Sequence, residues 1–446
     1  MQKYKGERWT KNYARTKNYL YDRILTFIRE ANSDQETDLH ALLEKIKILF
    51  QKRLFHHLPR FLEKAQGLAV KMEDFDAALR LIDYEKEVLL EGGDYERYSN
   101  AIGAILQRSE TLSDQRNEVI EMAHVRDRLI AGRVRGIEYI NAVIDSPLLA
   151  EGRQYKSATA HILSKRIRFD FYFYQGEIDK AITQADIAIA SYQSKSGLIA
   201  SYAGFKNFVY AVYYSAALKI VQSRFQEAEQ TITLLATFAG ADKREPALYL
   251  ERTTWFEVSI ARKTLDQKRG ERAIESYLDQ LNHGQLQFSE VVKIELDHLV
   301  AVFQINFGNP KDALVAVLRN RNRKIENYRP DLLYFSKVLF MVVHTELRNL
   351  DVVESSIRST RQSLLKQGKL TPFYSLILNF FAGFCKAKSK DKEARIAKDF
   401  ASQFDSGSWG AAVNYFDFGS WAKSLYSNQP MTKTLAEKFQ SAKDRQ

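Results

Sequence analysis

The 446-residue sequence contains one cysteine, seven prolines and twenty glycines, and each scarcity excludes a class of structure. A single thiol excludes a disulfide framework and favours a reducing compartment, so we expect a cytoplasmic location. Proline and glycine interrupt regular elements, so a chain with few of them favours long helices over many short strands. The thiol, Cys385, follows several phenylalanines, which predicts a buried structural role and not a reactive nucleophile.

Long hydrophobic runs are also missing. No window holds 18 apolar residues, and the longest comparable runs, 208–218 and 332–343, fit buried helices better than membrane spans. The polar, basic first ten residues do not resemble a secretory signal. We therefore expect a soluble protein that is not inserted in a membrane.

Sequence motifs of catalysis are absent as well. The chain has no glycine-rich phosphate loop, no H-E-x-x-H and no G-x-S-x-G, so we expect no enzyme activity and no cofactor. The only histidine pair, His56 and His57, is adjacent in sequence, and adjacent helical side chains point about 100° apart. A surface or helix-start role is favoured for this pair over a metal site.

The composition that remains is that of a folded protein, with 45% apolar and 27% charged residues. The formal charge of +11 permits an acidic partner, a nucleic acid or a membrane surface, but it requires none of them. Apolar residues recur at helical spacing through the first 150 residues. This spacing predicts helices over 13–31, 36–50, 57–70 and 75–90 and helical structure over 94–144, before a break at Ser146-Pro147.

From about residue 155 a short pattern repeats, in which a turn is followed by a small or apolar residue near the start of a helix. These anchors lie 40 to 47 residues apart and are Ala181, Ala228, Ala273, Ala313, Val353 and Ala394. Twelve residues before them, alanine occurs at four of six positions: 216, 261, 301 and 382, with Phe169 and Met341 at the others. Small residues at both places predict pairs of closely crossing helices joined by tight turns.

The pattern Tyr172-x3-Gly176-x4-Ala181-x6-Ala188 resembles tetratricopeptide repeats (TPR), and the resemblance covers about 155–403 with a weaker echo at 57–91. The spacing exceeds the family's period of about 34, and its tryptophan and proline positions are mostly unoccupied, so the chain resembles a divergent TPR-like protein. The resemblance implies an all-α, right-handed superhelix. We expect an N-terminal helical region over 1–150, acting as a cap or docking module, and a repeat array with C-terminal capping helices over 151–446.

In such superhelices the first helix of each pair lines the concave side. The resemblance therefore implies that partner-binding side chains lie on or near this side: Arg166, Asp170, Tyr210, Tyr213, Trp255, Arg262, Glu295, His298 and Asn306. Arginine and aromatic side chains anchor partners, and asparagine bonds extended backbones. The main hypothesis is a non-catalytic scaffold or adaptor that binds a protein or peptide there.

Basic clusters support a second hypothesis, nucleic-acid binding. The first 30 residues combine eight lysines and arginines with interleaved aromatics, the residue types that contact phosphates and stack on bases. Two further basic runs, 319–329 and 386–398, fall at expected repeat turns, where solvated charge is ordinary. The aromatic runs 169–174 and 205–214 are interpreted mainly as repeat core, with some side chains facing a groove. Partner identity and oligomeric state stay open.

Overall fold

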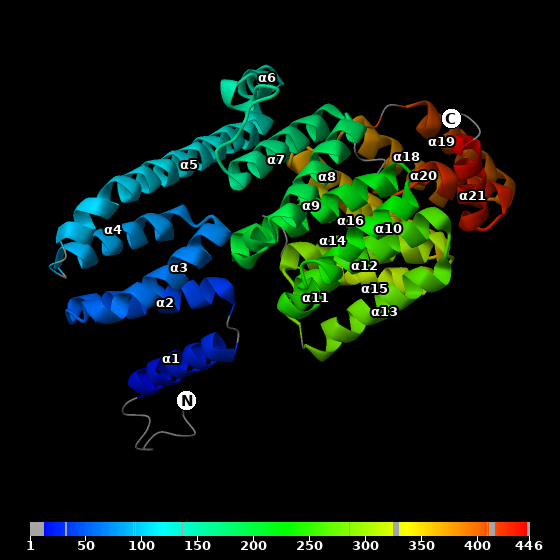
Figure 1. Ribbon diagram of the computed structural model, residues 1–446. Helices are drawn as coiled ribbons and strands as arrows, with labels where there is room; N and C mark the ends of the chain where they lie inside the picture. The colour runs from blue at the N-terminus through cyan, green and yellow to red at the C-terminus, as the bar shows by residue number, and fades with distance from the viewer. Residues whose placement is uncertain are drawn as a thin grey trace. The chain divides into compact units, whose positions relative to one another are not determined.

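The computed structural model describes residues 13–31, 34–91, 93, 95–135, 137–284, 286–323, 330–407, 409 and 415–443. These residues form an all-α fold, 85% helical, with no strand in the ranges given (Figure 1). The expected all-α fold class is confirmed for these residues, and the expected superhelix stays a prediction. The basic residues before position 13, together with Lys324 and Arg329 of the second basic run, lie outside the described ranges.

Consecutive helices pack against each other, and the chain divides into two compact units. The N-terminal unit ends at Leu218 and the C-terminal unit begins at Lys219, close to the end of α9 (Tyr202–Val221). A hydrophobic cluster of the N-terminal unit joins Met122 and Val125 to Ala160 and Ile167. The expected division at residue 150 stays a prediction.

The helices of the N-terminal unit lie close to the ranges expected from apolar spacing up to residue 144. In chain order they are α1 (Tyr13–Ala31), α2 (Gln35–Gln51), η3 (Phe55–His57), α3 (Leu58–Met72), α4 (Phe75–Glu91), α5 (Tyr95–Arg135), α6 (Ile137–Ile144), η4 (Pro147–Leu149), α7 (Ala158–Gln175), α8 (Ile178–Ser194), η5 (Ser196–Ala200) and α9. Pro147 begins a short 3₁₀ helix directly after the expected break.

Local sequence explains where α7 begins and ends. The Ser157 hydroxyl accepts a hydrogen bond from the Ala160 amide at 3.1 Å, which satisfies one of the free donors of the first turn. Gly176 follows the last turn with φ 75°, a left-handed conformation that glycine adopts without a Cβ clash. Helix α8 starts two residues later, so the turn is tight, and the anchor Ala181 is fully buried.

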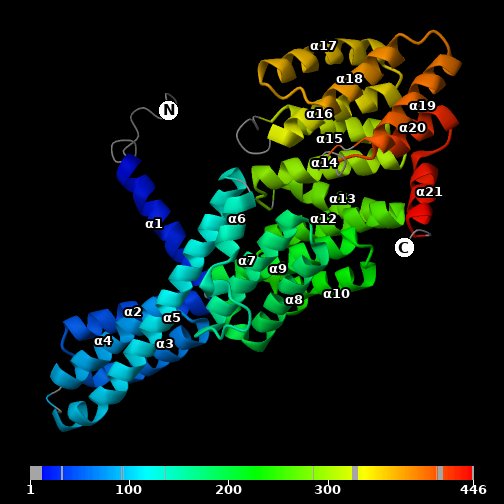
Figure 2. The same cartoon turned by 90° about the horizontal axis from the view of Figure 1, so that it is seen from above.

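The C-terminal unit continues the arrangement of successive packed helices, which Figure 2 shows for α14 to α18. Its helices are α10 (Phe225–Thr237), α11 (Ala241–Arg244), α12 (Pro246–Thr264), α13 (Gln267–His283), α14 (Glu290–Asn306), α15 (Pro310–Arg321), α16 (Pro330–Glu346), α17 (Leu350–Lys366), α18 (Pro372–Cys385), α19 (Lys390–Ser406), α20 (Phe418–Ser427) and α21 (Met431–Lys443). Helix α12 contacts both α13 and α14, and α14 contacts both α15 and α16. Contacts to the next helix and the one after are typical of stacked helix pairs.

One expected turn is displaced. The repeat pattern places a turn at Gly270, just before the anchor Ala273, but Gly270 is buried inside α13, which already begins at Gln267. The turn is formed instead by Leu265, which has φ 59°, and Asp266. A Cβ at Gly270 would lie 2.1 Å from the Phe303 ring, so this glycine permits close packing of α13 on α14. Within the described ranges, no helix has the length and apolar content needed to cross a membrane.

Candidate functional site

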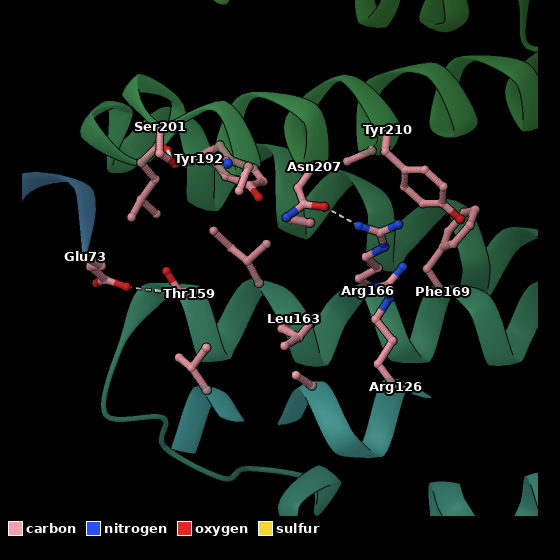
Figure 3. A pocket seen from close by; sticks show the side chains of 18 of the residues that line it. Glu73, Arg126, Thr159, Leu163, Arg166, Phe169, Tyr192, Ser201, Asn207 and Tyr210 are labelled. Carbon is pink, nitrogen blue, oxygen red and sulfur yellow. Dashed lines mark hydrogen bonds between the residues drawn. The ribbon is translucent and has the colours of Figure 1, made fainter. Parts of the chain in front are cut away.

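The N-terminal unit contains a partly open cavity of about 390 Å³, bordered by α5, α7, α8, α9 and the turn after α3 (Figure 3). This volume falls in the range of small-ligand sites, roughly 300–1,000 Å³. Most of the wall is apolar, and it includes Leu163, Ala185, Ala188 and Leu198. Arginines line one end of the wall and a carboxylate lies at the other (Figure 3).

Two arginines form the basic end of the cavity. Arg126 comes from α5 and Arg166 from α7, and both point toward the same region (Figure 3). The Nε atoms of both are buried and have no hydrogen-bond partner among the described residues. An arginine keeps its proton under all ordinary conditions, so two positive groups line the cavity, and each has a buried N–H donor that no described residue satisfies.

Three neighbouring side chains fix the orientation of Arg166. The guanidinium carbon lies 4.1 Å from the centroid of the Tyr210 ring, a cation–π arrangement. An Nη1–H of Arg166 donates to Oδ1 of Asn207 (Figure 3). The Tyr210 hydroxyl donates to Oδ1 of the buried Asp170 at 2.9 Å. Helix α9 therefore positions both the ring and the amide that hold the arginine of α7.

The electrostatics of this end favour an incoming anion. Burial lowers the pKa of the Arg166 guanidinium, and the positive charge of Arg126 lowers it further. The same burial and repulsion raise the free energy of the charged Arg166 side chain. A carboxylate would relieve both effects because it supplies negative charge and accepts N–H donors.

The opposite end of the cavity contains carboxylates that are used to build the wall. Glu73, at φ 52° after α3, accepts hydrogen bonds from the amides of Ala158 and Thr159 at 3.0 and 2.8 Å (Figure 3). Glu36 accepts from the Tyr202 amide at 2.6 Å. Each carboxylate caps the N-terminus of a helix that lines the cavity, which is a favourable place for negative charge. The acidic end therefore holds α7 and α9 in place.

Two further polar groups come from α8. Burial raises the pKa of the Tyr192 hydroxyl, so this side chain stays neutral and can donate a hydrogen bond. The Oε1 atom of Gln184 is buried and accepts no hydrogen bond from the described residues. A buried carbonyl oxygen of this kind can accept a ligand N–H, for example from a peptide amide.

The structure brings three of the expected partner-binding residues together here. Arg166, Asp170 and Tyr210 form the cluster at the basic end, although Asp170 acts through Tyr210 and is not itself part of the cavity wall. Tyr213 is 7% exposed, and its ring packs edge-to-face on Tyr214 with centroids 5.2 Å apart. The aromatic run 169–174 is divided, since Phe169 is buried and Phe173 is 40% exposed.

The other expected residues lie in the C-terminal unit. Trp255 and Arg262 are on α12, and burial lowers the pKa of the Arg262 guanidinium to about 10. Glu295, His298 and Asn306 are on α14, where Glu295 is partly exposed and Asn306 is buried. Their role in partner binding stays a prediction.

Residues of the C-terminal segment contact His298 of α14 and two side chains of α16. Nε2 of the buried His298 lies 3.2 Å from the carbonyl oxygen of Tyr415, and the Tyr415 hydroxyl donates to Asp331 at 2.5 Å. Trp421 of α20 donates from Nε1 to Glu346 at 2.7 Å. These contacts position the segment against α14 and α16.

Sequence reasoning missed Arg126, Asn207 and Gln184 as members of the cavity. Arg126 belongs to the 41-residue helix α5, which carries no repeat pattern, and nothing in its local sequence separates it from neighbouring arginines. Asn207 lies three residues before Tyr210, so the helical register of α9 could have indicated it. Among the described residues, no group of three His, Cys, Asp or Glu side chains is placed to hold a metal.

Comparison with known proteins does not narrow the function, because no protein-family profile and no curated protein matches this chain.

Proposed function

We propose that the protein is a non-catalytic binding module that captures a carboxylate-bearing peptide or protein segment in the cavity of the N-terminal unit. The observation that carries the proposal is the pair Arg126 and Arg166: both side chains line one cavity, and the buried Nε atom of each has no hydrogen-bond partner in the described chain. An oriented guanidinium pair suits a carboxylate, which accepts two parallel hydrogen bonds. The ligand anion would be a C-terminal carboxylate or an acidic side chain.

The rest of the cavity supports a peptide over a simple inorganic anion. Apolar walls from α5, α7 and α8 would cover a ligand's side chains, and Gln184 and Tyr192 would bond its amides. Arginine and tyrosine are also enriched where a few residues supply most of the binding free energy. A bare anion would leave the apolar part of the wall uncovered.

A TPR-like superhelix would provide the frame for this role. The packed successive helices, the buried anchors at 181, 228 and 313 and the resemblance around Gly176 all favour it. Pre-ordered helices reduce the entropy that binding costs, because the groups of the site are already oriented. The expected cytoplasmic location belongs to this proposal, since a cytoplasmic partner would supply the segment.

The test is selective binding of free-acid peptides. A pool of short synthetic peptides without Asp or Glu would be prepared in two forms, with a free C-terminal carboxylate and with a C-terminal amide. Equilibrium dialysis and mass spectrometry should show enrichment from the free-acid pool. A second amidated pool containing Asp and Glu would detect recognition of acidic side chains.

A double substitution, Arg126→Gln with Arg166→Gln, should abolish the enrichment in whichever pool shows it. The matched control is Arg128→Gln, which changes an exposed side chain two residues after Arg126 on α5. This variant should bind the peptides like the unmodified protein. Equal retention of all three pools by the unmodified protein would contradict the proposal.

A further inference from the structure

Helix α1 exposes a continuous apolar face. Leu20, Ile24 and Phe27 follow one another at helical spacing and are 53%, 55% and 70% exposed. Tyr21 and Leu25 adjoin them and are also exposed. Isolated exposed apolar residues are ordinary, but a continuous apolar stripe marks an interaction surface.

The charge around this face is basic. Arg15, Lys17 and Arg23 of α1 are exposed, and Lys3, Lys5, Arg8 and Lys11 precede the helix in the sequence. Over residues 1–31 eight lysines and arginines stand against three acids. A helix with an apolar face and a surplus of positive charge has the composition of one that lies in the interface of an anionic membrane.

We propose that α1 docks on the surface of an anionic lipid bilayer, with Leu20, Ile24 and Phe27 inserted at the level of the acyl-chain boundary and the basic side chains on the headgroups. The aliphatic residues distinguish this partner from a nucleic acid, because leucine and isoleucine offer no stacking surface for bases. The charge distinguishes it from a second copy of the chain, whose equally basic helix would be repelled. This inference is independent of the cavity and of its ligand.

The experiment is vesicle co-sedimentation of the full-length protein. The probes are phosphatidylcholine vesicles with about 30% phosphatidylserine and vesicles of phosphatidylcholine alone. We expect binding to the anionic vesicles that is at least about tenfold stronger and that weakens as salt rises from about 0.1 M to about 1 M. The double variant Leu20→Asp, Ile24→Asp should lose at least about tenfold in partitioning to anionic vesicles.

The matched control is Leu365→Asp, which replaces a leucine of α17 that is 59% exposed. It should bind vesicles like the unmodified protein, and circular dichroism should show equal helicity for all variants. Absence of binding to anionic vesicles overturns the proposal, as does an equal loss in the control. Two other results also overturn it: tighter binding to duplex DNA that the double variant retains, or a dimer in vesicle-free solution that the double variant dissociates.

Discussion

The guanidinium of Arg166 lies over the ring of Tyr210, with 4.1 Å between the guanidinium carbon and the ring centroid. Because the Tyr210 hydroxyl also bonds Asp170, one side chain of α9 links a cation and an anion of α7 that are one helical turn apart. The ring therefore holds the guanidinium at a fixed place in the cavity wall. Orientation of the cation, and not only its presence, is therefore built into the fold.

Substitution of Tyr210 tests that relationship. Tyr210→Leu removes the ring and the hydroxyl, so affinity for the selected free-acid peptide should fall by roughly tenfold, the value of a partly buried cation–π contact. Tyr210→Phe keeps the ring under the guanidinium and should lose only a few-fold, because the lost hydrogen bond to Asp170 holds the ring and is not made to the ligand. Isothermal titration calorimetry would measure both. Equal affinities for both variants and the unmodified protein would remove Tyr210 from the site.

Glu73 should stabilise the N-terminal unit through its two bonds to the start of α7. Glu73→Ala leaves the amides of Ala158 and Thr159 without this acceptor, so the free energy of unfolding should fall by about 1–2 kcal/mol. Urea denaturation followed by circular dichroism measures the change. Glu63→Ala, an exposed position on α3, should leave the transition within about 0.5 kcal/mol of the unmodified protein. A similar loss in both variants would contradict a specific role for Glu73.

The helices were predictable because their signals are local. Apolar spacing set the ranges of α1 to α4, and the proline at 147 and the glycine at 176 marked real breaks. The turn expected at Gly270 was wrong because a glycine in a turn and a glycine under a packed ring look alike in sequence. Only the approach of Phe303, from another helix, separates the two cases.

The cavity was only partly predictable, because it is assembled from distant segments. Arg166 and Tyr210 were expected from the repeat register, which is a property of neighbouring helices. Arg126 comes from α5 and Glu73 from the turn after α3, and both reach the cavity through tertiary packing. No periodicity in one sequence reports that packing, so the second arginine became visible only in the fold.

Cys385 should react slowly with thiol reagents. Burial raises its pKa to about 11, and the thiol lies 3.7 Å from the carbonyl oxygen of Leu350. The thiolate fraction at pH 8 is then about one in a thousand, against roughly one in four for a free cysteine. Ellman's reagent at pH 8 should label the folded protein at least about tenfold more slowly than the urea-unfolded protein. Equal rates in the two states would contradict a structural role for the thiol.

His344 should make the protein less stable in mild acid. It is buried on α16, where its ring packs on Phe340. Its Nδ1 atom lies 3.1 Å from Nδ2, the side-chain amide nitrogen of Asn349. Burial lowers the pKa of His344, and the positive charge of Arg321 lowers it further. The unfolded chain takes up a proton near pH 6.5, whereas the folded chain does so only at lower pH. The free energy of unfolding therefore falls as the pH drops from about 6.5 through the folded pKa.

Urea denaturation at pH 7 and pH 5 measures this difference directly. His344→Gln should reduce the difference between the two pH values, although it also lowers stability at pH 7 by removing a buried ring. Part of the difference should remain, because burial lowers the pKa of His161 in the N-terminal unit as well. The matched control is His124→Gln, at an exposed side chain of α5. If His344→Gln keeps the full difference, protonation of His344 does not govern acid stability, and the buried ring contributes through packing alone.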